Sequence, residues 1–349
     1  MSVVRIPERV ILVRGQRLRA DVSNDVQAVT IDDGQGRSDH FQITVNNSHG
    51  RWTDLDLFDE GNEVSIMMGY RGGPSLLFEG FVIAPGGSWP ESGNPVLTVE
   101  GYDLGYKLGR NVKNRAWANV SDADIAKAIA SEAGMQSAVQ STPITHEQIM
   151  QEGVSDLAFL FERAEELNYD VWVDRKTLHF GKRSRGTDIE LRWRHNIQSI
   201  TNLRKSIADV STAVVVKGWD PVRKFELVGQ SDVEQTDDPA SLLEEVGAKI
   251  TAKVMGKVQT FTSRQIPTSQ AEAQAIAEAK FSNLASSYVE GSLEAEGDPR
   301  LRRGVAFRLA GVGKRFEGEY LITDSRHTIG NDGYRTSISF SNQRVTGAS

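Results

Sequence analysis

Carboxylate side chains are the groups in this sequence best suited to chemistry, because two of them in one cleft can act as acid and base. Two sets could be proposed, namely Glu100 with Asp103, and Glu162 with Glu165 and Glu166. Such chemistry also needs a shared cleft and split pKa values, which spacing alone does not supply. The second set lies largely opposite the apolar stripe of the helix expected there, so we interpret it as a solvated helix face.

Other catalytic and cofactor chemistries find little support. The absence of cysteine excludes disulfides, thiolate metal sites and cysteine nucleophiles. The segment Gly34–Asp39 begins like a dinucleotide-binding loop, but it lacks the third glycine and precedes a strand, so we predict a hairpin loop. The histidines show no metal-ligand spacing and are interpreted as surface or core residues: His40, His49, His146, His179, His195 and His327. We therefore expect no catalytic residue, no bound metal and no cofactor.

Charge and hydropathy restrict the partners. The chain of 349 residues carries 40 basic and 47 acidic side chains, a net charge of −7 that disfavours nucleic acid. One stretch is locally basic around Trp193, and we interpret it as a subunit or partner contact: Lys182, Arg183, Arg185, Arg192, Arg194, His195, Arg204 and Lys205. Apolar runs are far shorter than the ~20 residues of a membrane-spanning helix. A charged, proline-containing start predicts no signal peptide, and hence cytoplasmic assembly.

The elements that would position these groups begin with strands. Apolar and polar residues alternate through the first hundred residues between turn-forming glycine, asparagine and proline. The segments are 26–31, 40–45, 64–68, 76–78 running into 81–83, and 96–100. Without helical stretches between them, these strands predict an antiparallel barrel or sandwich over residues 1–109.

The periodicity then changes. A capping pattern at Ser121 predicts a helix that ends at Gly134, and a second helix runs from Ser155 to Asn168. The apolar stripe of the second helix consists of Leu157, Leu160, Phe161, Ala164 and Leu167. A hairpin of 171–174 and 177–180 follows. We therefore predict a small inserted α/β module over residues 110–190.

Strands return for residues 191–349 and predict a second barrel. It includes strands at 212–219, 305–309, 320–322 and 334–340, the last following a turn at 331–333. A helical insertion around 237–288 interrupts it, where the capping box at Ser269–Glu272 opens the clearest long helix. The predicted fold is thus α+β and mainly β, with two similar antiparallel barrels, an inserted α/β module and a helical insertion.

An internal similarity supports two barrels. Gly61 and Gly304 each precede a strand, and Phe78-Glu79-Gly80 and Phe316-Glu317-Gly318 each enter the next strand. A final alternating strand follows in both copies. Duplication predicts that Phe78 and Phe316 occupy matching strand positions, in two barrels that do not share one continuous sheet.

The order of these pieces resembles the phage late control protein D family, which comprises baseplate hubs of contractile tails and the N-terminal part of VgrG proteins. The likeness covers roughly residues 55–345 and rests on five matches: 58–64 with 77–80, 101–104, 155–160 with 164–166 and 178–180, 217–221 and 316–323. The residues that carry the family pattern are Gly61, Phe78, Glu79, Gly80, Asp103, Asp156, Phe159, Leu160, Trp219, Phe316, Glu317 and Gly318.

The resemblance implies a homotrimer whose six barrels form a pseudo-hexameric ring between a sixfold inner tube and a threefold spike. The implied partners are the chain itself, the inner tube protein, a separate spike protein and other baseplate proteins. The spike is expected to be separate because Ser349 follows soon after the second barrel. The product would be a phage tail-like particle, with no catalytic role for this chain.

The alternative is a carboxylate-dependent glycan hydrolase or a carbohydrate-binding β protein. It would use the carboxylates above and some of the tryptophans, which are Trp52, Trp89, Trp117, Trp172, Trp193 and Trp219.

Overall fold

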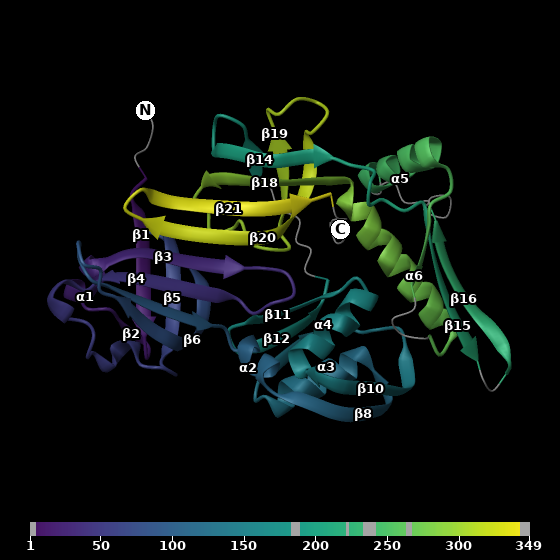
Figure 1. Ribbon diagram of the computed structural model, residues 1–349, viewed down its shortest axis with the longest axis horizontal. Helices are drawn as coiled ribbons and strands as arrows, with labels where there is room; N and C mark the ends of the chain where they lie inside the picture. The colour runs from purple at the N-terminus through teal and green to yellow at the C-terminus, as the bar shows by residue number, and fades with distance from the viewer. Residues whose placement is uncertain (1–4, 183–188, 221–222, 233–241, 263–266, 343–349) are drawn as a thin grey trace.

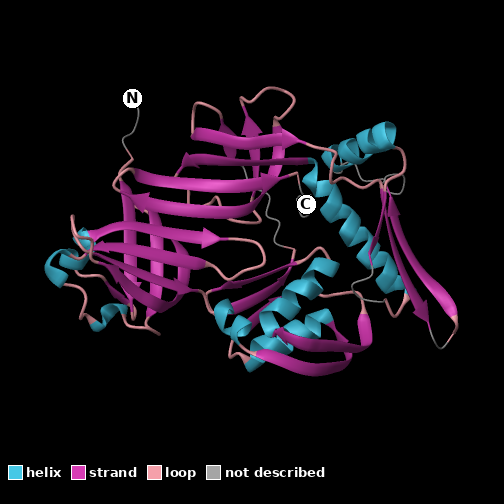
Figure 2. Ribbon diagram, in the orientation of Figure 1, coloured by secondary structure: helices cyan, strands magenta, loops and turns pink. Residues whose placement is uncertain are grey.

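The protein is mainly antiparallel β, as predicted, with two barrel-like strand assemblies, an α/β module and a helical insertion (Figures 1 and 2). The computed structural model describes residues 5–182, 189–220, 223–232, 242–262 and 267–342. No helix among these residues is both long and apolar enough to cross a membrane.

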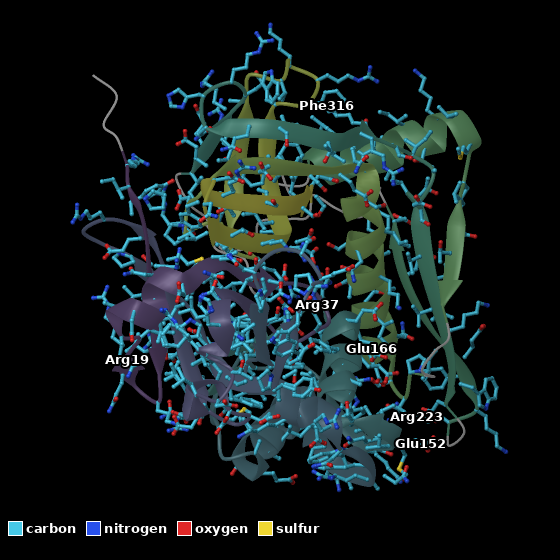
Figure 3. All side chains as sticks on the ribbon, turned by 60° about the vertical axis from the view of Figure 1, so that its left-hand side comes forward. Arg19, Arg37, Glu152, Glu166, Arg223 and Phe316 are labelled. Atoms are coloured by element: carbon cyan, nitrogen blue, oxygen red, sulfur yellow. The ribbon has the colours of Figure 1, made fainter. Side chains whose placement is uncertain are left out.

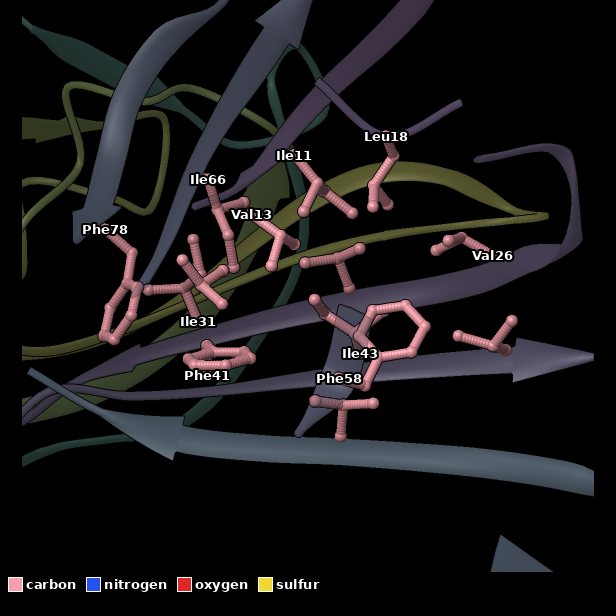
Figure 4. Close-up of a cluster of buried hydrophobic side chains, with 14 of the residues drawn as sticks. Ile11, Val13, Leu18, Val26, Ile31, Phe41, Ile43, Phe58, Ile66 and Phe78 are labelled. Carbon is pink, nitrogen blue, oxygen red and sulfur yellow. The ribbon is translucent and has the colours of Figure 1, made fainter. Parts of the chain in front are cut away.

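The first barrel follows from the alternation of its sequence. Its elements are β1 (Pro7–Val13), β2 (Gln16–Arg17), α1 (Ala20–Asp25), β3 (Val26–Asp33), β4 (His40–Asn46), β5 (Glu63–Tyr70), β6 (Ser75–Ser88) and β7 (Val96–Tyr102), with 3-10 turns at Ser48–Gly50 and Asp56–Phe58. Every second residue of β4, and of β3 from Val29 to Ile31, points into an apolar core, where the rings of Phe41 and Phe78 lie 5.0 Å apart (Figure 4). The loop at 34–39 joins β3 to β4 as a hairpin, as predicted.

The strands of the first barrel pack closely. The two short strands expected at 76–78 and 81–83 form one strand, β6, with an irregularity between Val82 and Ala84. Gly80 is required here, since a Cβ atom on it would lie 2.2 Å from the carbonyl oxygen of Tyr102.

The inserted module combines helices with short strands. Its elements are α2 (Gly105–Arg110), β8 (Val112–Ser121), α3 (Asp122–Glu132), β9 (Gln136–Val139), β10 (Thr145–Ser155), α4 (Asp156–Glu166), β11 (Asp170–Asp174) and β12 (Thr177–Gly181). Ser121 and Asp124 form the predicted capping box of α3, and Ser155 caps α4. The β8–β10 pair was not predicted, because β8 has no fully buried side chain and β10 buries His146, Ile149 and Gln151 at uneven spacing.

The second barrel carries the longest additions. Its elements are β13 (Glu190–Arg192), β14 (Ile197–Lys205), β15 (Ala213–Asp220), β16 (Phe225–Asp232), α5 (Leu242–Met255), β17 (Gln259–Thr262), α6 (Gln270–Ala285), a 3-10 turn at Ser286–Tyr288, β18 (Val289–Glu296), β19 (Ala306–Ala310), β20 (Gly318–Gly330) and β21 (Gly333–Ser341). The hairpin of β15 and β16 projects from the barrel, with α6 against it (Figure 1). The start of the helix-prone stretch, 237–241, lies outside the described residues.

Buried apolar side chains form three clusters. One draws on residues 11–99, one on 108–180 and one on 189–340. Ile329 and Tyr334, from the β20–β21 hairpin, belong to the first cluster although they come from the second barrel. The division of the chain at 109 and at 190 stays a prediction.

One sheet runs through both barrels. Its strand order is β14-β18-β21-β20-β3-β4-β7-β6-β5-β1-β2, with β13 and β19 branching from β20. Figure 1 shows β14, β18, β21, β20, β3 and β4 following one another across the molecule. The expectation that the two copies would not share a sheet is therefore wrong, because β3 pairs directly with β20.

Candidate functional site

Among the described residues, the feature that most resembles an enzyme site is a buried cluster of charged side chains. Arg163 of α4 donates from Nε to Oδ1 of Asp122 at 2.6 Å and from Nη1 to Oε2 of Glu166 at 2.6 Å. His146 of β10 lies 3.0 Å from Asp122 through Nε2 and 3.4 Å from Glu272 of α6 through Nδ1. The cluster therefore ties three elements of the inserted module to the helical insertion of the second barrel.

The charges in this cluster stabilise one another. Burial alone would lower the pKa of His146, but its hydrogen bonds to Asp122 and Glu272 outweigh burial and raise that pKa to about 9. Burial likewise opposes ionisation of Asp122, yet contacts with His146 and Arg163 leave its pKa lowered. Burial raises the pKa of Glu166 despite the neighbouring Arg163. At neutral pH the cluster thus holds two cations among its carboxylates.

The predicted carboxylate set on α4 does not form one site. Glu166 is buried against Arg163, so its assignment to a solvated face is wrong; the arginine draws it into the interior. Glu165 is exposed and lies 3.7 Å from Lys280, whereas Glu162 lines a cavity of about 470 Å³ beside His146. The three side chains face three different environments, and no pair of them shares a cleft.

The two carboxylates of the other predicted set, Glu100 and Asp103 in the first barrel, also have separate environments. Glu100 accepts a hydrogen bond from Gln42 at 2.8 Å on the polar face of the sheet. Asp103 is buried just before α2, and burial raises its pKa to about 7. The structure therefore does not bring Glu100 and Asp103 together as an acid and base.

The locally basic stretch is partly neutralised. Arg192 lies 2.9 Å from Glu190, and Arg204 lies 3.0 Å from Glu290. Lys205 lies 5.7 Å from the centre of the Phe316 ring. Arg183 and Arg185 lie outside the described residues.

The family-pattern residues are spread over all parts of the chain. Phe159 and Leu160 are buried in the apolar core of the inserted module. Asp156 of the same module forms an ion pair with Lys113, whose Nζ lies 2.5 Å from Oδ2 of Asp156. Glu79 is half-buried on β6, and Glu317 accepts a hydrogen bond from the backbone of Gly311. Trp219 is 55% exposed on the projecting hairpin. In Figure 3, Phe316 lies far from the module that carries Glu152 and Glu166. No single pocket collects these residues.

The two barrels repeat one another strand for strand. In space the first follows the order β3-β4-β7-β6-β5-β1 and the second follows β14-β18-β21-β20-β19-β13. Equivalent strands also come in the same order along the chain. One pairing differs, since β1 is antiparallel to β5 whereas β13 is parallel to β19. Sequence analysis missed several of these strands, and only their pairing shows the full repeat.

The irregularities of the strands repeat too. The register shifts between Val82 and Ala84 in β6 and between Ile322 and Asp324 in β20. Gly61 donates its N–H to the carbonyl of Val82, and Gly304 donates its N–H to the carbonyl of Ile322, both at 2.8 Å. Both glycines have positive φ angles, 86° and 75°. Val82 and Ile322 are therefore equivalent positions.

This equivalence corrects the predicted alignment. With Val82 matched to Ile322, the counterpart of Phe78 is Gly318, so the two Phe-Glu-Gly motifs are displaced by two residues. Phe78 is buried in β6, whereas Phe316 is half-buried in the turn before β20. The prediction that these two rings occupy matching strand positions is wrong.

Comparison with solved structures identifies the fold. The chain superposes on the 43 kDa tail protein of prophage MuSo2 from Shewanella oneidensis with a TM-score of 0.72 and 13% identity, covering 96% of this chain and 98% of that one. A tail protein from Neisseria meningitidis MC58 superposes with a TM-score of 0.70 and 13% identity, covering 97% of this chain and 98% of that one. The chain also superposes on an Escherichia coli type VI secretion component with a TM-score of 0.57 and 14% identity, covering 95% of this chain and 76% of that one. That component is described as structurally similar to bacteriophage T4 tail proteins.

These likenesses confirm, at the level of fold, the predicted resemblance to proteins of phage tails. A family model described as "Alg8 N-terminal domain" matches residues 7–331. A search among curated proteins found no match.

Proposed function

We propose, on the basis of its phage tail-protein fold, that this chain is a structural baseplate subunit of a contractile, phage tail-like injection particle. By its sequence the chain belongs to the Alg8 N-terminal domain family. More specifically, we propose a homotrimeric hub that joins a sixfold inner tube to a threefold spike. Its partners would be those two proteins and other baseplate proteins, with assembly in the cytoplasm before the particle acts outside it.

The observation that carries this proposal is the strand-for-strand repeat. Two equivalent barrels in one chain allow three chains to present six equivalent surfaces around a threefold axis. Such a ring could bind sixfold and threefold partners at once, one on each face. The β20–β3 pairing would fix the two barrels of one chain in their relative positions.

A structural role also accounts for the groups that resemble an enzyme site. The side chains of the buried charged cluster form ion pairs with one another. The members of each predicted carboxylate set have different partners and do not face one another. The tryptophans do not form one sugar platform: Trp52 is buried and donates to Asp25, Trp172 stacks on His179, and Trp89 and Trp219 are exposed on different barrels. We therefore favour a non-enzymatic subunit over a glycan hydrolase or lectin.

Native mass spectrometry at micromolar concentration tests the proposal. We expect a species of three times the 38.4 kDa chain mass, and binding of that species to a tube or spike protein of the same particle. A monomer that hydrolyses peptidoglycan or another glycan would overturn the proposal in favour of the enzyme.

A further inference from the structure

Two strand edges remain open in the described part of the continuous sheet, one along the second half of β6 and one along β14. The first half of β6 pairs with β5, but residues 84–88 pair only with β7 among the described residues. Strand β14 ends the sheet order and, apart from one isolated bridge between Ile197 and Trp193, pairs only with β18 within the described chain. Open edges expose backbone N–H and C=O groups that can pair with another chain.

The two barrels of one chain are joined by the pairing of β20 with β3, which we call the internal joint. The repeat relates the two open edges to these two strands. Strand β20 is the counterpart of β6, and strand β3 is the counterpart of β14. Within one chain the second half of β20 pairs with β3, from Ser325 opposite Asp33 to Ile329 opposite Val29. The same joint between β6 and β14 is not formed within the described chain, where β14 and β6 are separated by six strands of the sheet order.

From this relation we propose that residues 84–88 of β6 pair antiparallel with β14 of a second copy of this chain. The inference rests on the proposed ring and specifies how its subunits join. Carrying over the internal register places Gly86 opposite Arg204 and Ser88 opposite Thr201, as Arg326 faces Asp32 and Thr328 faces Thr30. Such a joint is head-to-tail, the kind that closes rings.

Trp89 supplies independent support. It follows β6 and is 60% exposed, and its counterpart by the same alignment is Ile329. Ile329 is buried in the apolar cluster of the first barrel, across the internal joint from its own barrel. By analogy, Trp89 would pack beside Ile200 of the neighbouring copy. Buried tryptophans commonly dominate the energy of interfaces.

The composition of this edge also suits pairing. No charged side chain occurs from Ile83 to Pro90, although charge is the usual protection of an exposed edge. Gly86 leaves space for a larger residue opposite, such as Arg204, whereas the indole ring of Trp89 covers Gly87. Pro85 lacks an N–H, so it can contribute only its carbonyl to the joint.

Cysteine cross-linking tests the register, because the natural chain contains no cysteine. The double variant Gly86→Cys with Arg204→Cys should, on oxidation with copper phenanthroline, shift most chains into covalent dimers and trimers on a non-reducing gel. Gly86→Cys with Thr201→Cys is the matched control, since that pair would be too far apart for a disulfide. Cross-linking of the control alone would overturn the proposed register.

Native mass under reducing conditions separates this inference from the proposed function. Trimers with neither pair cross-linked would overturn the joint and leave the hub intact, whereas monomers throughout would overturn the hub. Trp89→Ala should lower the trimer fraction without unfolding the chain, and Trp219→Ala, the other exposed tryptophan, should not. Equal trimer fractions in both variants would also contradict the joint.

Discussion

Two buried histidines lie in interiors of opposite electrical character. His146 in the inserted module is surrounded by Asp122, Glu272 and Arg163, and its pKa is raised to about 9. His327 on β20 lies 2.9 Å from the hydroxyl of Tyr334 and 3.0 Å from the carbonyl of Leu301, and burial lowers its pKa to about 4. One histidine is held charged and the other neutral.

The difference shows how environment determines the role of a reactive residue type. In the module the charges satisfy one another and tie α4 to α6; in the barrel a neutral ring joins β20 to its neighbours through hydrogen bonds. Both interiors use polar groups for structure. Backbone atoms at the edges of β6 and β14 have no partner strand among the described residues, and this is where we place the function.

Loss of the central arginine should have the largest effect. Arg163→Met would leave Glu166 buried without its cation and Asp122 with His146 alone, and should lower the free energy of unfolding by about 3–5 kcal/mol. Arg19→Met, which removes an exposed arginine paired with Asp21, should cost about 0–1 kcal/mol. Chemical denaturation of both variants provides the comparison, and similar losses in the two would show that the module interior is not held by charge.

The apolar core of the first barrel gives a third interior for comparison. Phe78→Ala should lower the free energy of unfolding by about 3–5 kcal/mol, because the ring is buried against Phe41. Phe316→Ala should cost clearly less, since this ring is half-buried in a turn. Equal losses would support the original alignment of the two motifs and contradict the one drawn from strand register.

The two histidines should give opposite dependences of stability on pH. The His146 contribution is complete below pH 6.5 and should be lost as pH rises through about 9, an effect of about 3 kcal/mol. His327 binds a proton more readily in the unfolded chain, so its contribution should be lost as pH falls from 6.5 towards 4, by a similar amount.

The matched variants for this experiment are His146→Gln and His327→Gln, each followed by thermal unfolding across pH 4–10. The first should remove the alkaline loss and the second the acid loss, relative to the natural chain. If neither profile flattened, the assignment of charged and neutral interiors would be wrong.

The smallest effects are expected from the dispersed carboxylates. Single amide substitutions at these carboxylates should leave the oligomer and the activity of the particle largely intact, because a structural subunit needs no proton transfer at these side chains. The variants are Glu100→Gln, Asp103→Asn, Glu162→Gln and Glu165→Gln. Native mass and a particle activity assay would check this. A selective loss of activity of about 10²–10⁴-fold, with fold and oligomer unchanged, would instead indicate a lost catalytic acid or base.

Sequence alone predicted the elements whose signals are local. Alternation located β3, β4 and β7, and capping residues located α3 and α4. The buried state of Glu166 was not predictable, because it depends on Arg163 being drawn towards Asp122, which lies on another helix. The Phe-Glu-Gly repeat suggested duplication but gave a register two residues out, since a short motif does not fix strand pairing.

A cryo-EM structure of the purified oligomer would test the central claim most directly. The account predicts a closed ring of three chains with six superposable barrels, in which β6 of each chain continues into β14 of the next and Trp89 is buried. Chains joined through their inserted modules or projecting hairpins, with β6 and β14 still open to solvent, would contradict it.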